Sequence, residues 1–178
     1  MKVAFLDRDG VINKEINYLY KINDFEYTSN CKEGLKILIQ KGFQIIIVTN
    51  QAGIAKNIFS ESDYYNLTNY YITDLKNSGI EILDIFHCPH HHNAKNIKYK
   101  KRCNCRKPRP GLFLQAQNKY DIDMDNSITI GDKISDIEAS IKAKVGRHFL
   151  VKSGHKIEIT DDDRFDIHQD LFRVALSL

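Results

Sequence analysis

The chain has 178 residues, of which 42% are hydrophobic and 28% are charged, as in an ordinary globular domain. Its 26 basic and 23 acidic residues leave a formal charge of +3, which is too small an excess to indicate nucleic-acid binding. No apolar run is long enough to cross a membrane. An apolar segment follows Lys2 directly and leaves no room for a signal peptide. We therefore expect a cytoplasmic monomer without nucleic-acid or membrane partners.

Short apolar runs alternate with helical patterns along the chain. Strands are predicted where apolar and often β-branched residues follow one another, at 3–6, 43–50, 79–88, 127–132 and 147–151. Helices are predicted at 31–41, 60–77, 110–120 and 134–143, with a weak helix at the end of the polar tail 156–178. Ser60 and Asp63 stand at the positions of a capping box, with Asp in place of the usual Glu. The alternation predicts one α/β domain over 1–178, doubly wound, with a mostly parallel sheet.

Polar side chains follow three predicted strands at the point where each strand ends. They are Asp7 and Asp9 after the first strand, Thr49, Asn50 and Gln51 at the end of the second, and Asp132 after the fourth. Turn and cap chemistry explains each group alone, because Asp-Gly and Gly-Asp form turns and Thr-Asn can cap a helix. It gives no reason for all of them to share one rim. Because ligands bind at the carboxyl ends of parallel strands, we expect a site at this edge of the sheet.

The chemistry of these residue types indicates phosphoryl transfer. Asp7 and Asp132, brought together, would form a hard oxygen site that suits Mg²⁺ and would repel each other without a cation. A carboxylate can attack phosphorus, and the second acid, Asp9, can protonate the leaving oxygen and later take a proton from water. The transferring group also needs positive charge and hydrogen-bond donors, for which Lys107 and the hydroxyl of Thr49 are candidates.

A second group of metal-ligand residues lies in the polar segment 88–105. It consists of two pairs with 12 residues between them, Cys88 with His90 and Cys103 with Cys105. This spacing is close to that of zinc sites. Three thiolates and one imidazole would leave no open position, so a metal here would be structural. Two alternatives stay open: the thiols are free, or one of the two following histidines replaces His90.

Four motifs in chain order resemble those of the haloacid dehalogenase (HAD) superfamily of phosphotransferases: DRDGVIN, TNQAGI, RKPRPG and GDKISD. CPHH and CNCRKP resemble the zinc loop of its histidinol-phosphatase-like branch. The resemblance implies a Rossmann-like HAD fold with a zinc-binding loop at about 88–105 and no large cap domain. The chain departs from the branch at Ala52, where a small polar residue is usual, and at EINY, residues 15–18.

The resemblance also implies roles for residues. Asp7 would be the nucleophile and Asp9 the general acid/base, with Thr49 and Lys107 steadying the phosphoryl group. Mg²⁺ would be held by Asp7, Asp132 and the main-chain carbonyl of Asp9. Zn²⁺ would be held by Cys88, His90, Cys103 and Cys105. The implied substrate-binding residues are Glu15, Ile16, Asn17, Tyr18, Asn50, Gln51, Arg106 and Lys133. Outside these sets, Asp136 is expected to orient its neighbours, and His148, His155 and His168 are expected at the surface.

The branch implies a phosphorylated substrate and one of two activities. The first is removal of the 7-phosphate of D-glycero-D-manno-heptose 1,7-bisphosphate, for nucleotide-activated heptose in lipopolysaccharide or another surface glycan. The second is hydrolysis of histidinol phosphate in histidine biosynthesis. A free-standing chain without a dehydratase domain favours the first. A hypothesis from another class is a non-catalytic zinc-binding module with an acidic cation site, which would not need Asp9 beside Asp7.

Overall fold

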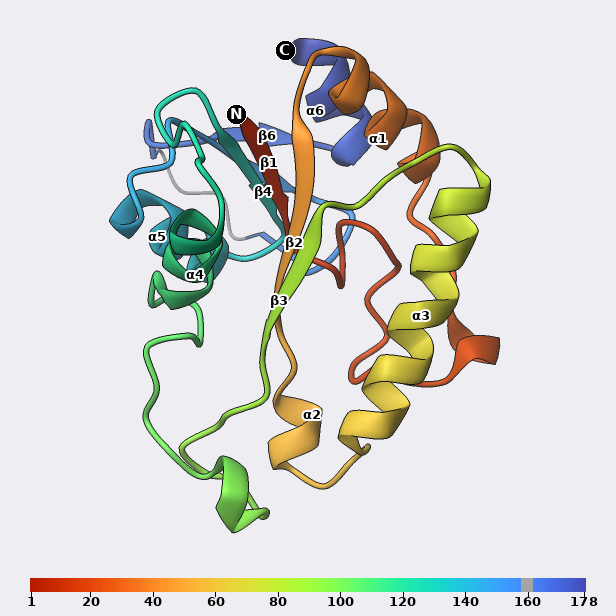
Figure 1. The fold of residues 1–178 in the computed structure, drawn as a ribbon, viewed down its shortest axis with the longest axis vertical. Helices are drawn as coiled ribbons and strands as arrows, with labels where there is room; N and C mark the ends of the chain where they lie inside the picture. The colour runs from red at the N-terminus through yellow and green to blue at the C-terminus, as the bar shows by residue number, and fades with distance from the viewer. Residues whose placement is uncertain (158–161) are drawn as a thin grey trace.

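A six-stranded sheet forms the centre of the protein in the computed structural model, which describes residues 1–157 and 162–178 (Figure 1). The strands are β1 (Val3–Leu6), β2 (Gln44–Asn50), β3 (Asp84–Cys88), β4 (Ile128–Gly131), β5 (Arg147–Val151) and β6 (Asp166–His168). Their order is β3-β2-β1-β4-β5-β6, and all five pairings are parallel. The predicted parallel sheet is therefore confirmed, and β1 lies between β2 and β4.

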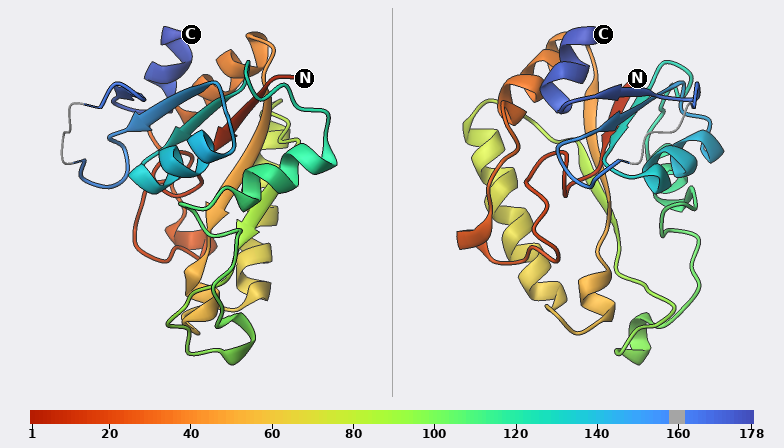
Figure 2. Two further views of the ribbon diagram at one scale, coloured as in Figure 1. Left: turned by 90° about the vertical axis from the view of Figure 1, so that its left-hand side faces the viewer. Right: turned by 180° about the vertical axis from the view of Figure 1, so that it is seen from behind.

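Helices cover both faces of this sheet. They are α1 (Cys31–Gln40), α2 (Ala52–Ala55), α3 (Glu61–Asn77), α4 (Gly111–Lys119), α5 (Ile134–Lys142) and α6 (Leu171–Ser177). Two short 3-10 turns, η1 (Ile22–Asp24) and η2 (Ile97–Tyr99), complete the set. Figure 1 shows α1 and α3 on one side of the strands and α4 and α5 on the other, and the left view of Figure 2 has α4 and α5 in front of the sheet. The doubly wound layout is confirmed.

Alternating side chains of β1 enter two separate cores. Leu6 is fully buried in a core that it shares with Leu35 of α1. Phe5 points to the opposite core, where its ring centroid lies 5.0 Å from that of Phe113 on α4. A strand buried on both faces has to be apolar along its length, so its polar residues are confined to its ends. Figure 1 shows β2 and β3 running down toward α2 and the 88–105 segment, which places their carboxyl ends near these parts.

The largest differences between prediction and structure are one strand boundary and two elements that the sequence missed. The strand predicted at 79–88 begins only at Asp84, although the main-chain N–H of Leu83 already donates to Ile45 of β2 at 2.8 Å. The one-turn helix α2 lies between the predicted strand 43–50 and the predicted helix 60–77, where the sequence indicated no element. The tail 156–178 contains β6 in addition to its helix, and the sequence missed this strand because its three residues include only one apolar side chain.

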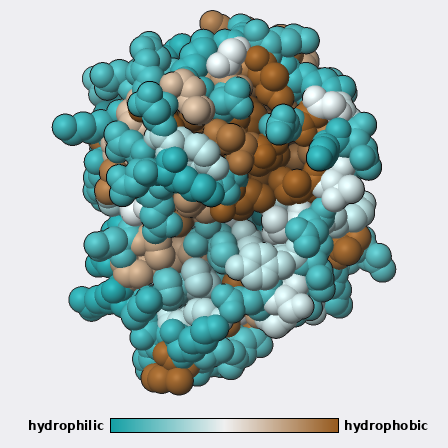
Figure 3. Space-filling view, viewed as in Figure 1, coloured by the Kyte–Doolittle hydropathy of each residue, from teal (hydrophilic) through white to brown (hydrophobic). Residues whose placement is uncertain are grey.

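The edge of the sheet at β3 is only half-buried, since this strand pairs with β2 alone. Figure 3 shows hydrophobic residues gathered over the start of this edge, on a face that is otherwise largely hydrophilic. In the part of the chain that the structure describes, the helices are too short or too polar to cross a bilayer.

The capping box of α3 provides a test of local stability. The Ser60 hydroxyl accepts a hydrogen bond from the main-chain N–H of Asp63, and the Asp63 carboxylate accepts one from the N–H of Ser60. We expect Ser60→Ala to lower the free energy of unfolding by about 1 kcal/mol in chemical denaturation, because the helix loses a cap. Ser62→Ala, at an exposed position of the same helix, is the control. Equal effects of the two substitutions would contradict the assignment.

Candidate active site

A cavity of about 370 Å³ lies at the carboxyl ends of the strands. The predicted site residues that line it are Asp7, Asp9, Glu15, Asn17, Tyr18, Asn50, Gln51, Arg106, Lys107 and Lys133. Of the predicted catalytic, magnesium-binding and substrate-binding residues, three do not line it: Ile16 is exposed to solvent, and Thr49 and Asp132 are buried. The structure thus brings most of the predicted residues to one cavity, although they come from distant parts of the chain.

Three carboxylates meet beside this cavity because β1 and β4 are neighbouring parallel strands. Asp7 follows β1, Asp132 follows β4, and Asp136 lies in the first turn of α5. One oxygen of each lies within 4.8 Å of the others. Gly10, which has a φ of +83°, permits this approach, because a Cβ there would lie 2.4 Å from Oδ2 of Asp132. The predicted meeting of Asp7 and Asp132 is confirmed.

Lys107 is the buried cation among these acids. Its Nζ lies 3.1 Å from Oδ1 of Asp7 and 2.7 Å from Oδ1 of Asp136, and it donates to the carbonyl of Val48 at 2.7 Å. Asn50 fixes its main chain, accepting from the N–H of Lys107 at 3.1 Å and donating to its carbonyl at 3.2 Å. Burial alone would lower the pKa of Lys107, but the charges of the two carboxylates raise it. The lysine is therefore held as a cation.

One lysine leaves the three carboxylates with excess negative charge. Burial raises the pKa of Asp7 to about 7, although the charge of Lys107 acts to lower it. Burial also raises the pKa of Asp132. Among the described residues, Oδ1 of Asp132 has no hydrogen-bond partner although it is buried. A hard oxygen set with surplus charge and a free buried oxygen fits Mg²⁺, which would favour the ionised form of both acids.

Asp9 lies beside this cluster in a different environment. Its carboxylate accepts hydrogen bonds from Nε and Nη2 of Arg8 at 3.1 and 2.8 Å, from Asn13 at 2.9 Å and from Gln51 at 3.1 Å. Burial acts to raise its pKa, but the charge of Arg8 and these hydrogen bonds hold the pKa below the usual value. The same amide nitrogen of Gln51 donates to the hydroxyl of Thr49 at 2.9 Å and so links this hydroxyl to Asp9. Asp7 and Asp9 therefore have opposite protonation tendencies, as paired acid and base groups do.

The outer part of the cavity is polar and cationic. Asn17 and Tyr18 have left-handed backbone conformations, with φ of 58° and 63°, in the segment that enters the cavity wall. The sequence prediction missed Lys56, which follows α2, lines the cavity and donates to the hydroxyl of Tyr18. Together with Arg106 and Lys133, this lysine makes the mouth suitable for an anionic, hydroxyl-rich ligand.

His155 is exposed, as predicted, but it also contacts a site residue, which the prediction did not include. The side chain is 43% exposed, yet it lines the cavity, and its Nδ1 lies 2.6 Å from Oδ2 of Asp132. The sequence did contain an indication of this position. His155 follows the end of β5 by four residues and therefore lies at the carboxyl ends of the strands. Sequence reasoning could not use that indication without knowing that β5 neighbours β4.

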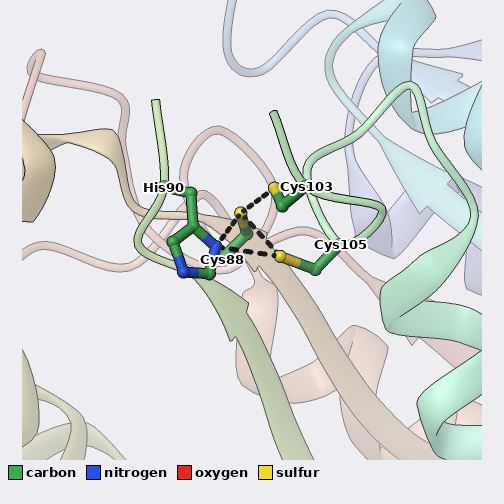
Figure 4. A group of neighbouring side chains, drawn as sticks. All are labelled: Cys88, His90, Cys103 and Cys105. Atoms are coloured by element: carbon green, nitrogen blue, oxygen red, sulfur yellow. Dashed lines mark hydrogen bonds between the residues drawn. The ribbon is translucent and has the colours of Figure 1, made fainter. Parts of the chain in front are cut away.

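The four predicted zinc ligands converge in one cluster (Figure 4). Sγ of Cys88 lies 3.0 Å from that of Cys105 and 3.5 Å from that of Cys103, and Nδ1 of His90 lies 3.2 Å from Sγ of Cys105. The hydrogen bond from Cys88 lowers the pKa of Cys105 to about 5. Three sulfurs and one imidazole nitrogen at these separations fit a tetrahedral zinc site. His90, rather than either following histidine, completes the cluster.

Lys107 allows a test of the buried charge cluster. We expect Lys107→Met to lower the free energy of unfolding by about 3–5 kcal/mol at about pH 8, because it leaves buried carboxylates without their counter-charge. The folded-state pKa values of these acids would lie above the unfolded values, so stability is retained at low pH and lost as pH rises. The loss should therefore be smaller at about pH 5. Lys76→Met, at an exposed position of α3, should have little effect. A loss that does not change with pH would contradict this account.

Comparison with known proteins agrees with this geometry. A family model described as polynucleotide kinase 3 phosphatase matches residues 2–165. The D-glycero-alpha-D-manno-heptose-1,7-bisphosphate 7-phosphatase of Photorhabdus laumondii is 58% identical over 155 residues, which cover 87% of this chain and 85% of the relative. The D-glycero-beta-D-manno-heptose-1,7-bisphosphate 7-phosphatase of the same organism is 42% identical over 154 residues, 86% of this chain and 82% of the relative.

A solved structure shows the same fold. The D,D-heptose 1,7-bisphosphate phosphatase from B. bronchiseptica, complexed with magnesium and phosphate, superposes with a TM-score of 0.84 at 25% identity. The match covers 99% of this chain and 97% of that one. The chain therefore belongs to the haloacid dehalogenase superfamily, within its heptose-1,7-bisphosphate 7-phosphatase family.

Proposed function

We propose that this protein is a Mg²⁺-dependent phosphatase that removes the 7-phosphate of D-glycero-D-manno-heptose 1,7-bisphosphate, in the synthesis of nucleotide-activated heptose. The observation that carries the proposal is that Asp7, Asp9 and Lys107 line one cavity, while an oxygen of the buried Asp132 lies within 4.8 Å of one of Asp7. Phosphoryl transfer through an aspartate needs a nucleophile, a cation and a separate acid/base, and this cavity offers all three. The substrate is supported by the activity named for the 58% identical relative.

In the first half-reaction, a carboxylate oxygen of Asp7 attacks phosphorus and forms an aspartyl-phosphate. The bond from phosphorus to the sugar oxygen breaks, and this oxygen takes a proton from Asp9. Oδ1 of Asp7 accepts from the N–H of Arg8 at 2.8 Å and contacts Lys107, which leaves Oδ2 as the attacking atom. Asp9 has to be protonated at this stage, and exclusion of water by the bound anionic substrate favours that form.

In the second half-reaction, a water molecule attacks the phosphorus of the aspartyl-phosphate. Asp9, now ionised, takes a proton from this water, the bond between phosphorus and Asp7 breaks, and inorganic phosphate leaves. The contacts of Asp9 with Arg8, Asn13 and Gln51 stabilise its ionised form, which is the form this step requires. Lys107 remains paired with Asp7 and Asp136 and contributes positive charge to the transferring group.

The cation that this mechanism requires would be held by Asp7, Asp132 and the main-chain carbonyl of Asp9. When bound, Mg²⁺ neutralises charge on the phosphoryl oxygens and orients the group. The magnesium and phosphate in the B. bronchiseptica structure support this part of the proposal. Asp136 is better suited to hold Lys107, to which it lies at 2.7 Å, than to ligate the cation.

We further propose that the α anomer is the preferred substrate. The relative named for the α anomer is 58% identical to this chain, and the relative named for the β anomer in the same organism is 42% identical. The cationic mouth, with Lys56, Arg106 and Lys133, suits a substrate that carries a second phosphate. Histidinol phosphate carries only one, so this feature favours the bisphosphate. The cytoplasmic location, the monomeric state and the single-domain organisation stay predictions from the sequence.

Steady-state kinetics with three substrates tests the proposed function. We expect kcat/KM to be highest for the α anomer of the heptose bisphosphate, lower for the β anomer and at least about tenfold lower for histidinol phosphate. Asp7→Asn should reduce turnover by about 10³-fold or more without unfolding the protein. Asp121→Asn, at an exposed position, is the matched control. A tenfold preference for histidinol phosphate would favour the alternative enzyme, and no hydrolysis of any substrate would favour the zinc-binding module.

The Cys/His cluster is proposed to hold one structural Zn²⁺. Its role would be to fix the segment that ends in Arg106 and Lys107, since Cys105 directly precedes them. Ordering this segment in advance spares the entropy that a free loop would lose when substrate binds.

Metal analysis tests this assignment. Purified protein should contain about one equivalent of zinc per chain, because the four ligands form a closed tetrahedral set. Cys105→Ser should lose the metal and lower Tm, whereas Cys31→Ser should keep it, because Cys31 is buried in another core on α1. If the wild type contains no zinc, or if both variants lose it equally, the cluster is not a zinc site.

A further inference from the structure

We propose that His155 is a positioning residue that holds Asp132 as a one-oxygen ligand of the catalytic cation and couples it to the substrate segment through Glu15. This inference rests on the proposed function, because it concerns the Mg²⁺ that the phosphatase would use. His155 has no role in the mechanism above, yet its ring lies in the cavity wall beside a proposed metal ligand.

The turn 153–155 fits closely around the carboxylate of Asp132. Oδ2 accepts two hydrogen bonds from His155, one from its main-chain N–H at 3.1 Å and one from Nδ1 at 2.6 Å. Gly154 permits this approach, since a Cβ there would lie 2.1 Å from the same oxygen. Ser153 donates to the carbonyl of Gly10 at 2.6 Å and fixes the turn against the loop that follows β1. The main chain and the side chain of His155 thus both fix the position of Oδ2 of Asp132.

The same contacts decide which oxygen of Asp132 is available. Two donors occupy Oδ2, whereas Oδ1 is buried and, within residues 1–157 and 162–178, has no hydrogen-bond partner. A carboxylate held in this way offers a single fixed oxygen to a cation. Mg²⁺ demands near-octahedral geometry, so a ligand that cannot rotate or bind through both oxygens suits it. Mutation of a partner that orients a metal ligand typically lowers metal affinity by about 10- to 100-fold.

His155 also faces the substrate segment. Its Nδ1 lies 3.9 Å from Oε2 of Glu15, whose Oε1 accepts from the main-chain N–H of Asn17 at 2.6 Å. This hydrogen bond closes the turn in which Asn17 and Tyr18 adopt left-handed conformations. The imidazole therefore touches the metal ligand on one side and approaches the proposed sugar-binding turn on the other. Because the ring lies against both groups, a substitution of His155 should affect the binding of both the cation and the substrate.

Calorimetric titration with Mg²⁺ tests this role directly, because it needs no turnover. We expect His155→Ala to raise the Kd for Mg²⁺ by about tenfold. His155→Asn should restore most of the affinity, since its amide nitrogen occupies the position of Nδ1. Lys156→Ala, at the exposed neighbouring position, should bind Mg²⁺ like the wild type. In parallel kinetics, KM for the heptose bisphosphate at saturating Mg²⁺ should rise in His155→Ala, because the contact with the Glu15 segment is lost.

A purely structural role for His155 would not produce this pattern. Unchanged Mg²⁺ affinity in His155→Ala, or equal weakening in the Ala and Asn variants, would overturn the inference. Failure of the proposed function would look different: the wild type would bind Mg²⁺ without hydrolysing heptose bisphosphate, and the comparison of Mg²⁺ affinities would still decide the role of His155.

Discussion

The mutual repulsion of buried carboxylates is the constraint on which the rest of this structure depends. Asp7, Asp132 and Asp136 place oxygens within 4.8 Å of one another, and Lys107 supplies one buried positive charge between them. Such an arrangement is costly in a folded protein unless a cation joins it. The parallel order of β2, β1 and β4 brings the acids together, and a glycine after β1 leaves the space they need. The fold therefore places acidic groups that need a cation at the position where a bound phosphate group would also need one.

The surroundings of this cluster separate three tasks that a phosphatase has to perform. The pKa of Asp7 is raised, whereas Arg8 helps to hold the pKa of Asp9 below its usual value, so the pKa values of two acids separated by one residue are shifted in opposite directions. Lys107 is fixed at its backbone by Asn50 and follows the cysteine cluster by two residues. The cavity opens toward Lys56, Arg106 and Lys133, which contribute charge away from the reacting phosphorus. The reacting acids, the fixed lysine and the substrate-binding cations thus come from different segments that meet at the carboxyl ends of the strands.

The sequence was sufficient to predict the acidic residues of the site, but not the side chains that contact them. Asp7, Asp9 and Asp132 were predictable because each follows a short, largely apolar strand, and the cysteine spacing alone indicated a metal cluster. His155 was not predictable in this way, because its partner is 23 residues away and meets it only through the pairing of β4 with β5. The direction of the Thr49 hydroxyl, which faces Gln51, also depends on packing that no local pattern records. The short strand β6 was missed because tertiary pairing, and not its own composition, stabilises it.

The proposed mechanism requires that the ends of β1 and β4, which are distant in sequence, bind one cation together. The most direct measurement is a crystal structure of the protein grown with Mg²⁺ and a phosphate mimic bound to Asp7. The account predicts Mg²⁺ at about 2.1 Å from one oxygen each of Asp7 and Asp132, and from the main-chain carbonyl of Asp9. It also predicts that Lys107 contacts the phosphate mimic. A cation bound elsewhere, or an Asp132 that turns away from it, would show that the ends of β1 and β4 do not share a cation.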